Sequence, residues 1–336
     1  MTTDDLAAAV DAVAGETGFS GVVRVDRDGS TLVEVAYGLA RRDLGVPNTV
    51  TTRFAIASGG KGLTALAVVR LIEDGALALD TPARAFLGRD LPLIPDDVTV
   101  EHLLAHRSGI GDYVDESSGG SVDDFVLPIP VQRLEGPEDF LPILDDHPSV
   151  FAPDARFAYN NSGYVVLALI AERAGGVPFH QQVEQRVCAP AGMADTTFLR
   201  SDELPADAAV GYLAAEGLRS NLFHLPVRGN GDGGIYSTAA DLLAFWDALF
   251  GGRIVAPEWM AKMTRARSEV PEESKRYGLG FWLAETGDPV LLEGYDAGVS
   301  FRSVHDPTRA LTHTVVANTS AGAWPVTRLL GEQLGT

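Results

Sequence analysis

The sequence predicts an α+β fold in which an antiparallel sheet is flanked by helices and a helical segment separates two parts of the sheet. The first observation is a β-hairpin at 20–39, where two alternating apolar runs meet at Asp28-Gly29, a strong hairpin signal. The second is a group of strand patterns near the C-terminus. The third is the segment 80–230, where helical stretches alternate with loops rich in Pro, Gly and Asp. The two ends of the chain are therefore expected to complete one sheet.

Apolar periodicity places the helices in the first two thirds of the chain. Residues 3–16 form the first expected helix, and residues 54–57 lead into a long apolar-periodic segment at 63–79. In the middle segment, helices are expected at 99–105, 165–174 and 180–187. Residues 112–156 lack such a pattern. Because a loop region of this length is usually functional, we expect it to line the entrance of a pocket.

The C-terminal third returns to strands. Ser237 or Thr238 is expected to cap a helix that runs to Phe250. The strand patterns that follow lie at 278–284, 289–293, 299–305 and 311–318, and a last helix is expected at 324–334. We predict a single domain over 1–336. Its α/β lobe comprises 1–79 and 231–336, and its helical lobe comprises 80–230.

The composition excludes several classes of protein. A net charge of −20 argues against nucleic acid or an anionic membrane as partner. The N-terminus lacks a positively charged signal region, and no apolar run approaches the roughly 18 residues that span a bilayer. We therefore expect a cytoplasmic protein. The only cysteine, Cys188, leaves no internal disulfide and is expected to be a buried thiol.

Ser58 and Lys61 are the first candidates for chemistry, in the run Ser58-Gly59-Gly60-Lys61. Positions three apart share a helix face, so the lysine nitrogen is expected beside the serine oxygen. A serine hydroxyl is a weak nucleophile until a base takes its proton, and a lysine held neutral by its surroundings can be that base. The competing interpretation is a serine near a helix cap with a solvated lysine.

Tyr159 and Asn161 are the second pair of candidates, in a turn before the helix expected at 165–174. A tyrosine beside an ammonium can act as general base for a serine and later as acid for the leaving group. An asparagine at this spacing can hold a lysine or bind a substrate amide. The alternative is a turn with a packed tyrosine.

Five segments, in chain order, carry a resemblance to a known family. They are the nucleophile segment 54–65, the helix-to-loop passage 71–82, an "LLxHxSG"-like segment at 99–110, Tyr-x-Asn within 157–164, and a "GG…ST…DL" segment at 233–242. Together they resemble the superfamily of penicillin-binding proteins and class C β-lactamases, in its esterase and D-peptidase branch. The resemblance implies a β-lactamase/transpeptidase-like fold with an all-helical second lobe.

The same resemblance implies roles for the candidates. Ser58 is the acylated nucleophile, and Lys61 and Tyr159 form its proton-transfer pair, with the general base left open between them. Asn161 positions the lysine and contacts the substrate. The oxyanion hole uses the backbone N–H groups of Ser58 and Gly298. No metal and no cofactor is expected, because His102 and His106 stand four residues apart without a third ligand.

The third motif of the family, Lys/His-x-Gly, departs from its pattern. Its place corresponds to residues 294–301, where Tyr295 stands for the basic residue and Ala297 for the glycine. Tyr295 and Asp296 are therefore the expected substrate-binding residues. The cation that would bind a substrate carboxylate is missing, so β-lactams fit poorly. Asp296 is hypothesised to favour a cationic substrate group, and a solvated turn is the alternative.

The leading functional prediction is a serine hydrolase that acts through an acyl-enzyme on a small ester or amide. A carboxylesterase comes first, because esters have good leaving groups. A D-aminopeptidase or amidase and an acyltransferase are the alternatives on the same fold. A catalytically silent binding or sensor protein is the alternative from another class. The natural substrate and the oligomeric state stay open.

Overall fold

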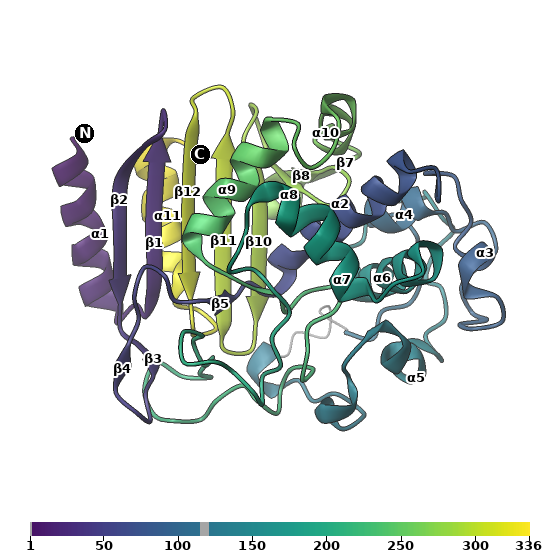
Figure 1. The fold of residues 1–336 in the computed structure, drawn as a ribbon, viewed down its shortest axis with the longest axis horizontal. Coiled ribbons are helices and arrows are strands. Elements are labelled where there is room, and N and C mark those ends of the chain that lie inside the picture. The colour runs from purple at the N-terminus through teal and green to yellow at the C-terminus, as the bar shows by residue number, and fades with distance from the viewer. Residues whose placement is uncertain (1, 115–120) are drawn as a thin grey trace.

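The computed structural model describes residues 2–114 and 121–336. Its main feature is an antiparallel eight-stranded sheet with the order β2-β1-β12-β11-β10-β9-β8-β7 (Figure 1). The strands are β1 Gly21–Arg27, β2 Ser30–Tyr37, β7 Ser268–Val270, β8 Lys275–Tyr277, β9 Trp282–Ala284, β10 Val290–Asp296, β11 Val299–Asp306 and β12 Leu311–Ala317. The predicted α+β class is confirmed: β1 pairs with β12, so both chain ends share one sheet.

The strand predictions differ from the structure on one side of the sheet. The strand expected at 278–284 begins only at Trp282, because Gly280 has a φ of +89° and turns the backbone out of extended geometry. The three-residue strands β7 and β8 were not predicted. The other three C-terminal strands and the Asp28-Gly29 hairpin are confirmed, and both turn residues of the hairpin have positive φ.

Helices cover both faces of the sheet. α1 (Thr3–Thr17) and α11 (Ala323–Leu334) pack on one face, and α9 (Ala239–Phe250), capped by Thr238, lies on the other (Figure 1). Because successive residues of a strand point to opposite faces, neighbouring valines enter different cores. Val22 belongs to the core shared with α9, and Val23 to the core shared with α1 and α11.

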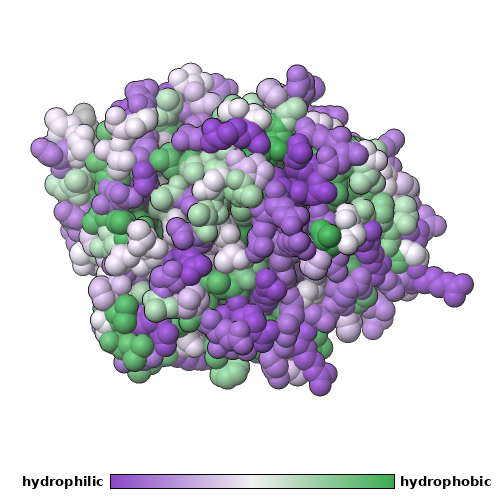
Figure 2. Space-filling view, viewed as in Figure 1, coloured by the Kyte–Doolittle hydropathy of each residue, from purple (hydrophilic) through white to green (hydrophobic). Residues whose placement is uncertain are grey.

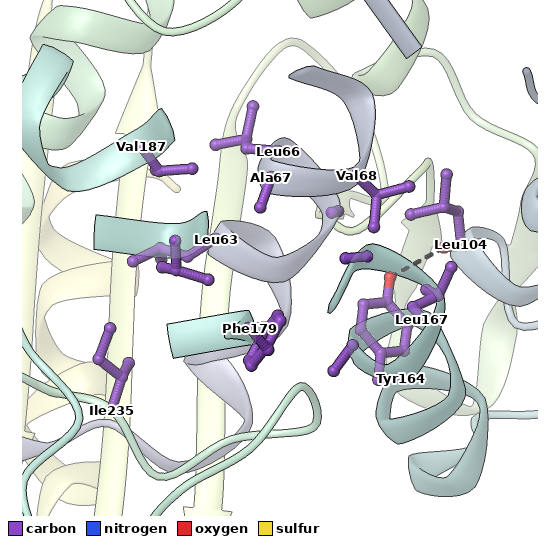
Figure 3. Close-up of a cluster of buried hydrophobic side chains, with 14 of the residues drawn as sticks. Leu63, Leu66, Ala67, Val68, Leu104, Tyr164, Leu167, Phe179, Val187 and Ile235 are labelled. Atoms are coloured by element: carbon purple, nitrogen blue, oxygen red, sulfur yellow. Dashed lines mark hydrogen bonds between the residues drawn. The ribbon is translucent and has the colours of Figure 1, made fainter. Parts of the chain in front are cut away.

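The helical region lies beside the sheet and is built around α2 (Gly60–Glu73) and α6 (Asn161–Gly175). Figure 3 shows Leu63 and Val68 of α2 among side chains of α6 and its neighbours, where the Tyr164 hydroxyl donates to Leu104 O at 2.9 Å. The helix expected over 63–79 ends at Glu73, because Gly75 adopts a φ of +76°.

Short elements complete the fold. These are α3 Arg84–Leu87, α4 Val100–Leu104, α5 Leu141–Leu144, α7 Phe179–Val183, a π-helical turn Glu184–Cys188, α8 Ala189–Ala191, α10 Pro257–Met263, and the paired strands β3 Leu39–Arg41 with β4 Val46–Pro47 and β5 Phe54–Ala55 with β6 Tyr236–Ser237. One buried cluster extends from the sheet through α2 into α6. The expected lobe boundaries at 79/80 and 230/231 stay a prediction.

The surface shows the hydrophilic character expected of a globular chain. On the face in Figure 2, hydrophilic side chains predominate and hydrophobic ones are scattered between them. Within residues 2–114 and 121–336, no helix combines the length and the apolar character that crossing a membrane requires. Cys188 is buried as expected, and burial raises the pKa of its thiol to about 12.

Candidate active site

The turn that carries Ser58 is built by glycines. Ser58 lies in a single 3₁₀ turn, Ala57–Gly59, between β5 and α2, rather than on α2 itself. The turn is tight, because Ala57 has a φ of +44° and a Cβ on Gly59 would collide with the Phe301 ring of β11. The glycine therefore lets the turn Ala57–Gly59, called the nucleophile turn below for the role predicted for Ser58, approach the sheet closely.

The Lys61 ammonium lies at the centre of the site. It is 2% exposed and donates to Ser58 Oγ at 2.9 Å, to Asn161 Oδ1 at 2.8 Å and to the carbonyl oxygen of Asp232 at 2.6 Å. The spacing Ser-x-x-Lys thus places the two side chains in contact, as predicted, and Asn161 holds the lysine. The solvated-lysine interpretation is wrong, because this lysine is buried.

The phenol of Tyr159 is placed by its aromatic neighbours. Its ring centre lies 4.9 Å from Lys61 Nζ, and the ring stacks parallel to Trp282 at 6.0 Å. The His106 ring also packs on the Tyr159 ring, with the two ring centres 4.4 Å apart. The chain on either side of Tyr159 is also tied to this histidine: Ala158 N donates to His106 O at 2.9 Å and Asn160 N to its Nδ1 at 3.1 Å.

His106 is therefore a neutral support for the tyrosine. Burial, with a further contribution from the Lys61 charge, holds the pKa of His106 well below its ordinary value. His102, four residues before His106, accepts from Thr99 N at 3.2 Å and helps to cap α4. Within the part of the chain that the structure describes, no cluster of His, Cys, Asp or Glu has the geometry to hold a metal ion.

The start of α6 fixes the position of Asn161. The helix begins at Asn161, four residues earlier than predicted, and the Asn160 side chain accepts from Gly163 N at 2.6 Å. The Asp112 carboxylate accepts from Asn161 N at 2.8 Å and from Ser162 N at 2.9 Å. Burial raises the pKa of Asp112, although these donors act in the opposite direction.

The predicted oxyanion donor Gly298 is wrong. Its N–H donates to Ser320 Oγ at 2.8 Å, in the turn between β10 and β11, and it does not line the cavity at Ser58. The glycine that abuts the nucleophile turn is Gly294, because an added Cβ there would collide with Ile56 O. The sequence placed the motif three residues too far along the strand.

The corrected motif is Leu292-Glu293-Gly294. Leu292 is buried against Gly62 of α2, so an apolar side chain takes the first position. Glu293 forms ion pairs with Lys275 at 2.8 Å and with Arg302. The corrected motif also lacks the expected basic residue, although Tyr295 and Asp296 are not the substituted positions.

A cavity of about 370 Å³ opens over Ser58. Tyr295 and Asp296 line it together with Asn161, and its walls include apolar residues from both sides of the undescribed segment: Val114, Val122, Phe125, Val126, Leu127, Leu199, Leu225, Pro226 and Val227. The expectation that the loop region 112–156 lines the pocket is confirmed for Val114, Val122, Phe125, Val126 and Leu127. Residues 115–120 of that region lie outside the described residues.

Sequence reasoning missed Asp232 and Tyr113. The Tyr113 hydroxyl donates to Asp232 Oδ2 at 2.5 Å, and both residues line the cavity. Burial raises the pKa of Tyr113 well above its ordinary value, and the charges of Asp232, Asp112 and Asp296 raise it further. The only sequence indication is that Asp232 directly precedes Gly233, where the recognised segment begins.

Comparison with known proteins agrees with this geometry. The model of the Beta-lactamase family matches residues 6–332. PbpX of Bacillus subtilis (strain 168), which carries the name of a penicillin-binding protein, is 30% identical over 273 residues, and the match covers 80% of this chain and 63% of that protein. This chain thus matches less than two thirds of the length of that relative.

Two further proteins are similar over most of the chain. Esterase EstB of Burkholderia gladioli is 31% identical over 300 residues, which cover 80% of this chain and 76% of EstB. The crystal structure of a penicillin-binding protein from Bacillus halodurans is 34% identical and superposes with a TM-score of 0.90, covering 96% of this chain and 99% of that one. Fold and site together support a serine hydrolase. The chain belongs to the beta-lactamase family, and the predicted resemblance is confirmed.

Proposed function

We propose that this protein is a carboxylesterase that works through an acyl-enzyme on Ser58. The observation that carries the proposal is the contact of Ser58 Oγ with the buried Nζ of Lys61 at 2.9 Å, at a cavity large enough for a small ester. A buried amine beside a hydroxyl supplies the base that serine lacks by itself. The similarity to EstB supports the choice of an ester.

Acylation begins when Ser58 Oγ attacks the substrate carbonyl. Its proton passes to the unit formed by Lys61 and Tyr159 when that unit has one proton fewer, as the Lys61 amine or the Tyr159 phenolate, and the unit then protonates the departing alcohol. Water attacks the acyl-enzyme in the second half, and the same unit takes the proton from water and returns one to Ser58. Asn161 keeps the lysine in place during both halves through its 2.8 Å hydrogen bond.

Tyr295 N–H is the oxyanion donor that we propose alongside Ser58 N–H. Asp296 and Val299 are the last pair before the β10–β11 turn and therefore exchange hydrogen bonds. Pairs alternate along an antiparallel ladder, so Tyr295 directs its N–H away from β11. Pairing with β9 stops at Leu291, and that edge of β10 borders the nucleophile turn. Two such donors stabilise the charge of the tetrahedral intermediate.

A D-aminopeptidase or amidase is the second candidate, and the cavity's carboxylates favour it because they suit an amine-bearing substrate. Ester hydrolysis remains first, since an alcohol leaves more readily than an amine. An acyltransferase would use the same acyl-enzyme with an alcohol or amine in place of water.

Active-site labelling tests the proposal. The protein is incubated with a fluorophosphonate or with p-nitrophenyl butanoate, and adducts are measured by intact mass. We expect one adduct on the native protein, none on Ser58→Ala, and an undiminished adduct on Ser30→Ala, which removes an exposed hydroxyl in β2. Failure of the native protein to form any adduct, with both reagents, would favour a silent binding protein.

A further inference from the structure

The cavity over Ser58 is acidic. Three carboxylates, those of Asp124, Asp232 and Asp296, line it, and neither lysine nor arginine occurs among the described residues of its wall. The Lys61 ammonium, beside the cavity, donates to three acceptors of the protein. An anionic substrate would therefore meet repulsion in this cavity, and a cationic one would meet attraction.

Asp232 is linked to Ser58 through Lys61, which donates to both residues. Its own carbonyl oxygen accepts from Lys61 Nζ at 2.6 Å, and that nitrogen lies 2.9 Å from Ser58 Oγ. Its side chain is oriented by the Tyr113 hydroxyl on Oδ2. A carboxylate has about four acceptor positions, so the hydrogen bond from Tyr113 leaves capacity for a ligand. Asp232 and Ser58 line the same cavity, so a group bound to the Asp232 carboxylate would share that cavity with the scissile carbonyl.

Burial of the Asp232 carboxylate disfavours its ionised form unless a cation lies nearby. The pKa of Asp232 is raised by burial, and the Lys61 charge and the Tyr113 hydrogen bond offset only part of that effect. Asp296 is close enough to raise the pKa of the same Tyr113 phenol. Carboxylates gathered in a partly dry cavity are stabilised by a positively charged ligand, because the ligand replaces lost hydration.

The chemistry of the wall identifies the cation as organic. The described residues contain no group of carboxylates and histidines with metal-ligand geometry. The rest of the wall is mixed: Phe125, Leu127 and Leu225 give it apolar surface, while Ser201, Asn221 and Asn230 add uncharged polar groups. Val126 and Tyr295 are exposed while also lining the cavity. A small molecule with an ammonium at the carbonyl end and an apolar remainder matches this surface.

We propose that Asp232, together with Asp296, makes this site selective for esters and amides whose acyl group carries an ammonium close to the scissile carbonyl. The inference rests on the proposed function, because the ammonium is recognised during attack by Ser58. Asp232 is a specificity-determining residue in this scheme. The proton transfers and the bonds broken are those of the acyl-enzyme route above.

Three p-nitrophenyl esters of matched length test the proposal: 3-aminopropanoate, butanoate and hemisuccinate, which carry an ammonium, a methyl group and a carboxylate at the chain end. At pH 7, we expect kcat/KM for the ammonium ester to exceed that for butanoate by about tenfold or more, since a charge-assisted hydrogen bond contributes about that factor. The hemisuccinate should be the slowest of the three.

Asp232→Asn and Asp296→Asn should each reduce the ammonium-to-butanoate ratio several-fold. The ratio is internal to each variant, so partial loss of folded protein does not change it. Glu285→Gln is the matched control, because it removes one negative charge from an exposed position between β9 and β10 and should leave the ratio unchanged. If Asp232→Asn does not fold, Asp296→Asn and the native ratio decide the question.

Equal kcat/KM values for the ammonium and neutral esters on the native protein would overturn the charge selection while leaving the esterase proposal intact. An unchanged ratio in both aspartate variants would also overturn it. Turnover of none of the esters, combined with no fluorophosphonate adduct, would instead remove the proposed function.

Discussion

Replacement of Gly294 by alanine is the sharpest test of how β10 meets the nucleophile turn. A Cβ at this position would lie far inside 3.0 Å of Ile56 O and 3.0 Å from Gly59 N. Both contacts are backbone atoms, which cannot rotate away as a side chain end can. The turn that carries Ser58 must therefore move relative to β10, by a distance on the order of 1 Å.

The expected effect on activity is larger than the effect on stability. Displacement of a reacting group by about 1 Å costs on the order of 100-fold in rate, and overpacking in a dense region costs about 1–3 kcal/mol of unfolding free energy. Gly294→Ala should thus lower kcat/KM for p-nitrophenyl butanoate by about two orders of magnitude. Urea unfolding should show a folded protein with a lower midpoint.

Gly15→Ala is the matched control for this change. Gly15 lies in α1, and an added Cβ there meets no atom within 4 Å. Because alanine is the better helix former, stability should rise by up to about 1 kcal/mol with unchanged activity. If Gly294→Ala retained native kcat/KM and stability, Gly294 would not be the residue against the nucleophile turn, and the corrected motif register would be refuted.

Three further predictions follow from buried groups. Burial lowers the pKa of His180 and His305 to about 4 and that of His313 to about 3. The unfolded chain binds protons at these histidines below about pH 6.5 and the folded chain does not, so the unfolding free energy should fall between pH 7 and pH 5 by about 2 kcal/mol per histidine. His313→Gln should reduce that decrease in denaturant titrations at the two pH values. Asp112→Ala removes the acceptor of two backbone N–H groups at the start of α6. It should therefore lower the unfolding free energy by about 1–3 kcal/mol in thermal unfolding and lower the rate of Ser58 acylation. If the variant were acylated at the native rate, the position of Asn161 would not depend on Asp112. Cys188 should resist iodoacetamide in the folded protein at pH 8 and react after unfolding, because its thiol is buried and protonated. Modification of the native protein at the rate of a free thiol would contradict the burial.

Local patterns in the sequence were sufficient for several elements. Asp28-Gly29 predicted the hairpin because both residues tolerate the positive φ that the tight turn needs. Thr238 predicted the start of α9 because its side chain accepts from Asp241 N. The helix at 63–79 was predicted too long, since apolar periodicity continued past the residues where Gly75 ends the helix. The strands β7 and β8 were missed because three residues are too few for a period of two to be recognised.

The sequence by itself determined that the side chains of Ser58 and Lys61 would meet. Ser58 and Lys61 are three positions apart, so short-range backbone geometry brings them together wherever the segment lies. Tyr159 and Asn161 were found the same way, as a short motif at the start of a helix. The absence of a basic residue in the third motif was also visible, because no choice of register within 292–297 places a lysine, arginine or histidine there.

Only the tertiary structure decided which glycine faces the serine and which carboxylates share its cavity. Gly294 and Gly298 are equivalent in a one-dimensional pattern, and the difference between them is a contact with Ile56, more than two hundred residues away. The contact between Asp232 and Tyr113 is even harder to predict from the sequence, since both residues lie in loops and no local periodicity relates the two loops. Long-range register depends on packing and hydrogen bonding between distant segments, and those interactions exist only in the folded chain.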